Sequence, residues 1–204
     1  MIDQFQYITL TIIDCEIDIC VSELTSYIED GRNKKYCIEK RPINLQDIYN
    51  VSPPSGGAHF SKFLLWEPQN LLGKTVFFSN YEDGKYTLIL NYCRTFNCKA
   101  ISIAISNQET IYPAFNFYYF DFSHKKNIER TISLIKDGKK WAFFSKGEVQ
   151  HFENISNYEN KLKIKRINKG IILSYLLKLG IDIENDKFWR STSDAATYFN
   201  QVSW

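Results

Sequence analysis

Hydrophobic and polar positions alternate in several short segments of the chain, and this alternation predicts a β-rich protein. The clearest case is Lys99–Ser106, in which Ile101, Ile103 and Ile105 fall on one side of a strand. We expect strands in six other segments, of which Ala114–Phe122 is nearly all aromatic rather than alternating. These segments are Phe5–Ile13, His59–Trp66, Thr75–Ser79, Ala114–Phe122, Ile128–Lys136 and Lys139–Lys146.

Three other segments have apolar residues at the spacing of one helix face. The first is Asp14–Asp30, which is rich in acidic residues. A second helix is expected to begin after a cap at Asn80 and to run to about Asn97. A third is expected to begin after the cap Asn168 and to end at Gly180, because glycine is favoured just past a helix end.

The strongest turn signal in the chain is Asp137-Gly138, between two predicted strands. This dipeptide is typical of a two-residue hairpin loop in which both positions have positive φ. Such a loop would place Lys136 opposite Lys139 and Leu134 opposite Trp141. The apolar residues of both strands would then lie on the same side of the hairpin.

The order of these elements predicts an α+β protein, with helices packed on one face of a mostly antiparallel sheet. We expect a single domain over residues 1–204, with an N-terminal part at 1–55 and a sheet-and-helix core at 56–189. Arg32–Pro54 is expected to be mostly loop with one short helix. The last segment, Arg190–Trp204, is expected to be a loosely attached tail.

Composition and charge fit a folded protein without a strong overall field. The chain is 44% hydrophobic and 24% charged, and its formal net charge is +2. This balance argues against disorder and gives no general attraction to nucleic acid, membranes or acidic ligands. The first thirty residues contain no Lys or Arg, and no apolar run is long enough to span a bilayer. We therefore expect a cytoplasmic protein.

The five cysteines fit free thiols better than disulfides or a metal site. Their odd number argues against a disulfide framework. Two pairs have four intervening residues, which is wider than the usual zinc spacing, and no His lies near them. We expect small buried hydrophobes, with no metal and no cofactor. The cysteines are Cys15, Cys20, Cys37, Cys93 and Cys98.

The histidines are the first candidates for catalysis, and they do not form a recognisable catalytic set. His59 follows a glycine pair, and His124 is most simply a surface residue. His151 is close in sequence to Glu148 and Glu153, a spacing that fits a solvated contact better than an acid–base couple. We do not expect an enzyme. An enzyme of unrecognised type that uses His59 or His151 remains an alternative.

Two local charge clusters differ from the near-neutral whole. Residues 1–30 contain seven acidic residues and no basic one, and such a field can steer a basic partner. Lys161–Arg166 is a basic strip, which makes a nucleic-acid-binding module a second alternative. Its interleaved residues are aliphatic and offer no stacking platform, so we do not expect nucleic acid as a partner. The residues predicted to face a protein partner are Glu16, Asp18, Glu23, Glu29 and Asp30.

Several segments together resemble a bacterial family. They are the hairpin Lys136–Phe144, Gly147, Phe152-Glu153, Leu176, Leu179-Gly180, Phe188-Trp189 and the run Gly56–Phe60. The resemblance is to immunity proteins of polymorphic toxin systems, including those of Rhs-type and type VI secretion effectors. It covers residues 56–189 and uses structural rather than catalytic positions. It implies a cytoplasmic protein that binds and neutralises a cognate secreted toxin by direct contact, and it supplies no catalytic residue. From the charge balance and the short apolar runs, we expect no membrane partner.

Overall fold

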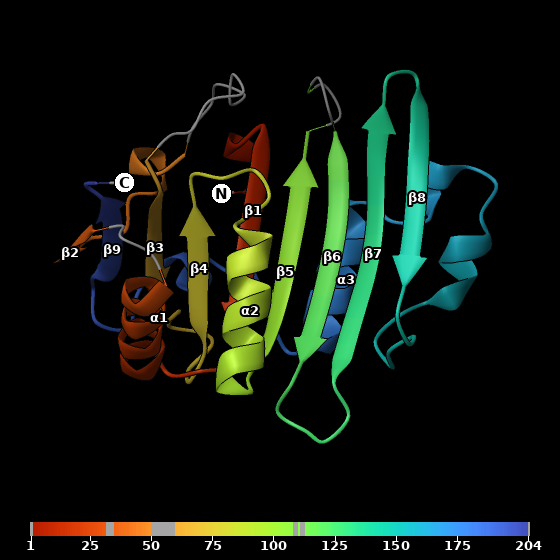
Figure 1. Ribbon diagram of the computed structural model, residues 1–204. Helices are drawn as coiled ribbons and strands as arrows, with labels where there is room; N and C mark the ends of the chain where they lie inside the picture. Colours follow the sequence, from red (N-terminus) through yellow and green to blue (C-terminus); the bar gives the residue numbers. More distant parts are fainter. Residues whose placement is uncertain (1, 32–34, 50–59, 108–109, 111–112, 204) are drawn as a thin grey trace.

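The computed structural model is built around one sheet. It describes residues 2–31, 35–49, 60–107, 110 and 113–203. The strands are β1 Tyr7–Ile13, β2 Tyr36–Arg41, β3 Lys62–Trp66, β4 Thr75–Ser79, β5 Lys99–Ser106, β6 Ala114–Asp121, β7 Ile128–Asp137, β8 Lys140–Lys146 and β9 Ala196–Gln201. They form a nine-stranded sheet in the order β2-β9-β3-β4-β1-β5-β6-β7-β8 (Figure 1). All neighbouring strands in this order are antiparallel.

The helices lie on both faces of this sheet. The α-helices are α1 Ile17–Gly31, α2 Tyr86–Phe96 and α3 Lys169–Lys178, and the 3-10 helices are η1 Ile2–Gln4, η2 Leu45–Asp47, η3 Ile155–Glu159, η4 Lys163–Lys165 and η5 Asp186–Trp189. α1 and α2 pack on one face, and α3 packs on the other (Figure 1). The α+β class and the antiparallel sheet are confirmed, but the expectation that all helices share one face is wrong for α3. Among the described helices, none is long and apolar enough to cross a membrane.

Both faces need a cover because the central strands are apolar on both sides. In β6, Phe117 and Phe120 point to opposite faces, and both are fully buried. Phe117 packs against Phe152 and Tyr175 on the α3 side. Phe120 packs against Tyr86 of α2 on the other side. The aromatic content of the chain therefore goes mainly into two cores, one on each face.

Most of the predicted strands are confirmed, but two strands of the sheet were not predicted. β4 and β5 have the predicted bounds. β2 lies in the segment that we expected to be mostly loop, where the expected short helix is only the 3-10 turn η2. β9 lies in the expected tail and pairs with both β2 and β3. Because Tyr198 and Phe199 are buried within the sheet, the prediction of a loosely attached tail is wrong.

The hairpin of β7 and β8 is confirmed, but its loop lies one residue further along the chain. Asp137 is paired with Lys140, where we expected Lys136 opposite Lys139. The loop residues are Gly138 and Lys139. Gly138 has a positive φ of 57° and Lys139 does not, as in a type II′ turn, whereas a type I′ turn needs positive φ at both positions. The predicted pairs shift by two residues, so the apolar side chains keep the faces that we expected.

α2 begins at Tyr86 rather than directly after Asn80. The Asn80 side chain instead accepts a hydrogen bond of 2.9 Å from the Lys62 N–H and so holds the start of β3. Gly84 has a φ of 61°, and a Cβ at this position would lie 2.3 Å from Cγ2 of Thr9. The chain must therefore turn closely against β1 before the helix can start.

α3 and both of its predicted ends are confirmed. The Asn168 side chain accepts a hydrogen bond from the Ile171 N–H at 3.1 Å and caps the first turn. Gly180 follows the last turn with a φ of 76°. The segment after the helix folds back, and Phe188 and Trp189 are buried beside Trp66.

Candidate partner-binding surfaces

The predicted partner-binding residues lie on α1 or at its start. Glu16, Asp18 and Glu29 are exposed. The Cys20 N–H donates to the Glu16 carbonyl at 2.9 Å, so the first helical turn begins at Glu16. Acidic side chains in this turn also interact favourably with the helix dipole. The side chain of Asp30 lies outside the described part of the structure.

An apolar side chain stands within this group of carboxylates. Ile19 is 49% exposed. Helical geometry places it one turn from both Glu16 and Glu23. Leu24 belongs to the opposite side of the helix and is buried against the sheet. An exposed apolar residue with a charged border has the composition of a protein-binding surface. We call Glu16, Asp18, Ile19 and Glu29 the acidic surface of α1.

Glu23 differs from the other predicted residues because its carboxylate turns toward α2. Its Oε2 accepts a hydrogen bond of 2.6 Å from the hydroxyl of Tyr92, which is fully buried. Burial, together with the neighbouring Cys20 and Glu23, raises the pKa of Tyr92, so this hydroxyl keeps its proton and donates. Glu23 therefore holds α1 against α2 and is a positioning residue rather than a free contact.

Four of the free cysteines pack beneath the acidic surface, in the core between α1, α2 and the sheet. Cys20 and Cys93 are fully buried, which confirms the prediction of small buried hydrophobes for this pair. The thiol of Cys20 interacts with Cys15, and this contact together with burial raises the pKa of Cys20. Cys37 is different, because it is exposed on the edge strand β2. Within the described residues, no group of three or more His, Cys, Asp or Glu is placed to hold a metal ion.

The carboxylates near His151 in the sequence are bound to other residues. His151 is exposed, while Glu153 turns inward to Arg130. Glu148 forms an ion pair with a lysine in the loop before β7. The two carboxylates that follow or precede His151 in sequence are therefore engaged elsewhere. His59 lies outside the described residues.

The pair of Arg130 and Glu153 forms a buried network behind β7. Arg130 is 1% exposed and donates to both carboxylate oxygens of Glu153, at 2.8 and 2.6 Å. Its remaining nitrogen donates to the carbonyls of Lys146 and Gly147, each at 3.1 Å. The Tyr158 hydroxyl also donates to Glu153, at 2.6 Å. Gly147 and Glu153 belong to the segments that resemble the immunity family, and here both have structural roles.

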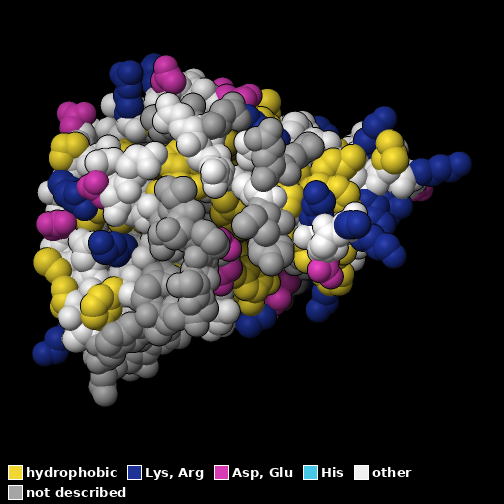
Figure 2. All heavy atoms as spheres, turned by 90° about the horizontal axis from the view of Figure 1, so that it is seen from above, with side chains coloured by type: hydrophobic (Ala, Val, Ile, Leu, Met, Phe, Trp, Pro, Cys, Tyr) yellow, Lys and Arg dark blue, Asp and Glu magenta, His cyan; other side chains and the backbone are white. Residues whose placement is uncertain are grey.

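The predicted basic strip Lys161–Arg166 is one part of a wider basic end of the molecule. Its middle forms the turn η4, and Arg166 donates to the Asn160 carbonyl at 2.8 Å while its guanidinium lies 5.3 Å from the ring centre of Phe143. Figure 2 shows Lys and Arg side chains gathered at the end of the molecule that carries the β7–β8 hairpin. The hairpin carries Lys136, Lys139, Lys140 and Lys146, and the strip carries Lys161, Lys163 and Lys165.

The face of β6, β7 and β8 on the α1 and α2 side carries none of the described helices (Figure 1). α2 forms its border, where the ring of Tyr86 packs on Tyr118 with 4.9 Å between centres. Beyond this border, Ile135 is 45% exposed and Phe144 is 54% exposed. We call the residues of this surface the open face. They are Asn116, Tyr118, Thr131, Ser133, Ile135, Ala142 and Phe144.

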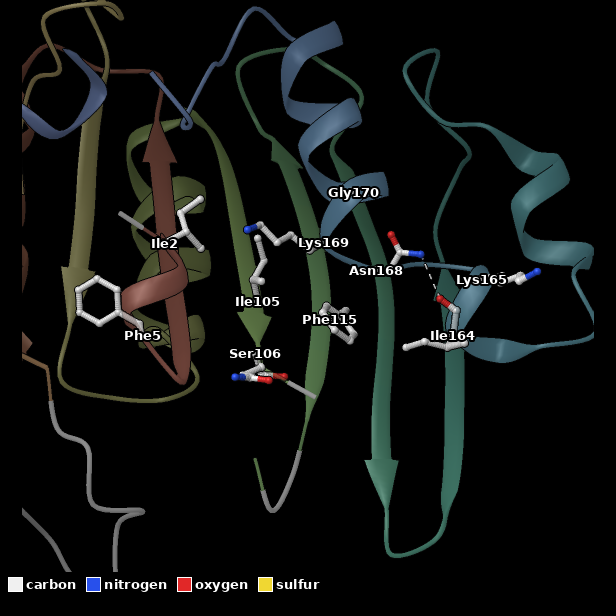
Figure 3. A pocket seen from close by; sticks show the side chains of 11 residues that line it. Ile2, Phe5, Ile105, Ser106, Phe115, Ile164, Lys165, Asn168, Lys169 and Gly170 are labelled. Carbon is white, nitrogen blue, oxygen red and sulfur yellow. Dashed lines mark hydrogen bonds between the residues drawn. The ribbon is translucent and has the colours of Figure 1, made fainter. Parts of the chain in front are cut away.

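A pocket of about 790 Å³ lies on the opposite face of the sheet, between η1 and the start of α3 (Figure 3). Ile105 and Phe115 form its floor, and Lys169 points over the floor toward Ile105. Two of its polar side chains are bonded to nearby backbone. Ser106 bonds with the N–H and the carbonyl of Ala114, and Asn168 caps α3. These bonds give both side chains a structural role.

The open face is the part of these surfaces that the sequence did not reveal. The exposure of Ile135 depends on where α2 ends across the sheet, which no local pattern records. Its sequence signal is the run Thr131, Ser133, Ile135, which is polar at two of its three positions on one face. Comparisons with protein-family models, curated proteins and solved structures found no match to this chain.

Proposed function

We propose that this protein is a cytoplasmic bacterial immunity protein that binds a cognate secreted toxin and neutralises it by direct contact. The observation that carries the proposal is Ile19, which is 49% exposed among carboxylates on a helix that is fixed to the sheet. The resemblance of residues 56–189 to immunity proteins supports the same function. The partner that fits the acidic surface of α1 is a basic surface of the toxin.

A rigid binding surface favours tight association, because less conformational freedom is lost on binding. α1 meets this condition. Cys20, Leu24 and Ile28 are buried against the sheet, and Glu23 joins the helix to Tyr92 of α2. The carboxylates on its outer side add a long-range attraction to a basic partner and raise the rate of encounter. The proposed toxin contact therefore combines a fixed scaffold with electrostatic steering.

The direct test is to mix the purified protein with the toxin domain encoded beside its gene and to measure affinity by calorimetry. We expect a dissociation constant well below micromolar and loss of toxin activity at one equivalent. No binding at micromolar concentration would contradict the proposal.

The same complex tests the acidic surface of α1. The double variant D18K/E29K should slow association by about tenfold at low salt, and this effect should shrink as salt screens the charges. Glu159 and Glu184 are exposed acidic residues outside α1, so E159K/E184K is a control with the same change in net charge. Equal association rates for the two double variants would exclude α1 as the steering surface without touching the proposed function.

A further inference from the structure

We infer that the open face of β6, β7 and β8 is a docking site for an apolar, acid-rimmed surface of the toxin. This inference rests on the proposed function and names a contact within it. It is independent of the acidic surface of α1, which lies at the other end of the same side of the sheet (Figure 1).

The centre of the open face is apolar and accessible. Ile135 and Phe144 are 45% and 54% exposed. The register pairs Ile135 with Ala142 and Ser133 with Phe144, so the two large side chains are diagonal neighbours. The residues directly opposite them in the register, Ala142 and Ser133, are small. Covering such a pair removes apolar area from water and favours binding.

The outer rim of the open face, along β8 and its loop, carries an excess of positive charge. The register places Lys140 and Lys146 on the same face as Phe144, at the two ends of β8, and both are exposed. The exposed Asp137 lies opposite Lys140 on the same face and offsets one of these charges. Lys139 is exposed in the adjoining loop. At the opposite border, the carboxylate of Glu129 is paired with Arg94 of α2 at 2.6 Å. A second copy of this face would bring lysine against lysine, whereas acidic side chains on the partner would complement the rim.

The open face is bordered on one side by α2, which stands above the level of the sheet, and we call this combination of sheet and helix flank the ledge. The helix stands beside the open face, and Tyr86 on its flank packs against Tyr118. A partner seated on the ledge touches the sheet from one side and the flank of α2 from another. Since α1 and the ledge share one side of the sheet, a single large partner can contact both. Its apolar, acidic part would lie on the ledge and its basic part near α1.

The test uses the double variant I135S/F144S, with affinity for the toxin domain measured by calorimetry. We expect affinity to fall by at least about thirtyfold, because central apolar anchors carry most of the binding energy. Leu177 is 56% exposed on α3, on the other side of the sheet, so L177S is the control for a loss of exposed apolar area. L177S should bind like the unmodified protein. Circular dichroism melts of both variants establish that they are folded.

A charge variant tests the chemistry of the partner. K140E/K146E should weaken binding by about tenfold at low salt, with a smaller loss at high salt. Unchanged affinity of folded I135S/F144S would overturn the docking site while leaving the proposed function in place. Tighter binding of K140E/K146E would overturn the acidic rim. No binding of the unmodified protein would remove the proposed function and this inference together.

Discussion

The two faces of strand β7 have opposite surroundings, although their residues alternate along one short segment. Arg130, Ile132 and Leu134 point to the α3 side and are at most 1% exposed. Thr131, Ser133 and Ile135 point to the α2 side, where Ile135 is 45% exposed. One side of the strand is closed by the network around Glu153, and the other side has no described helix over it.

Because of this difference, residues on one face of β7 should matter for stability, and residues on the other face are available for binding. We call the face of Arg130, Ile132 and Leu134 the closed face. Its side chains are buried in contact with other residues, so their removal should lower the stability of the fold. Side chains on the open face still contact water, so their loss should leave the fold almost unchanged. The residues of such a surface can be substituted to fit a different partner without a loss of stability of the fold.

The largest effect is expected from breaking the buried ion pair on the closed face. Arg130→Met leaves the carboxylate of Glu153 buried without its partner, and the two side chains are only 2% and 0% exposed. The free energy of unfolding should fall by about 3–5 kcal/mol. Urea denaturation of the variant and the unmodified protein measures this loss.

The matched control is the exposed ion pair of Arg94 and Glu129, whose side chains are 47% and 42% exposed. Arg94→Met should cost no more than about 1 kcal/mol, because solvent screens this pair. Similar losses for Arg94→Met and Arg130→Met would show that the two faces of β7 are equally important for stability. That result would contradict the difference in stability that we expect between the two faces.

The next largest effect on stability is expected at Leu134, compared with its neighbour Ile135, an aliphatic residue of the same size that points to the opposite face of β7. Leu134→Ala should lower the free energy of unfolding by about 2–5 kcal/mol, because Leu134 is 0% exposed. Ile135→Ala should change it by less than about 1 kcal/mol, since Ile135 is 45% exposed. Denaturation curves for the two variants, measured side by side, check the difference. A larger loss at Ile135 would mean that a part of the chain covers the open face.

The smallest effect is expected at alkaline pH, from tyrosines on opposite faces of β6. Burial raises the pKa of both Tyr118 and Tyr119 to about 12, above the ordinary value of about 10. The folded state thus holds these protons more tightly than the unfolded state. Their contribution to stability is complete below pH 10 and is lost as pH rises from about 10 to about 12. Denaturation at several pH values measures this decline.

Tyrosinate absorbance separates the two residues. Tyr118→Phe and Tyr119→Phe should each remove part of the late titration step near pH 12. Tyr118 tests the border of the open face, because it is shielded by Tyr86 of α2. If the step lost in Tyr118→Phe lies near pH 10 instead, the open face extends up to α2.

Sequence patterns predicted the elements whose residues alternate cleanly or carry strong local signals. β5 has such an alternation, and the capped α3 has clear signals at both ends. β9 was missed because the segment is polar with scattered aromatics. Its polar residues Thr197 and Gln201 are buried in the sheet beside Tyr198 and Phe199. β2 was missed because this edge strand is exposed and carries charged residues such as Glu39 and Lys40.

The candidate surfaces were only partly predictable. The acidic character of α1 is visible in the sequence, because its charges are local. The inward turn of Glu23 was not, since it depends on Tyr92, 69 residues away in the chain. The open face depends on the placement of three helices on two sides of the sheet. Such tertiary arrangements leave no periodic trace in the strands that they cover or leave bare.

The position of β9 has a consequence for synthesis of the protein on the ribosome. Among the described strands, β2 pairs only with β9, which follows all the others in the chain. β2 therefore has no strand to pair with until the ribosome has made β9, which begins at Ala196. Long-range pairings of this kind slow folding. The nascent chain thus exposes an unpaired β2 until β9 has been made, and chaperone contact would be useful during that interval.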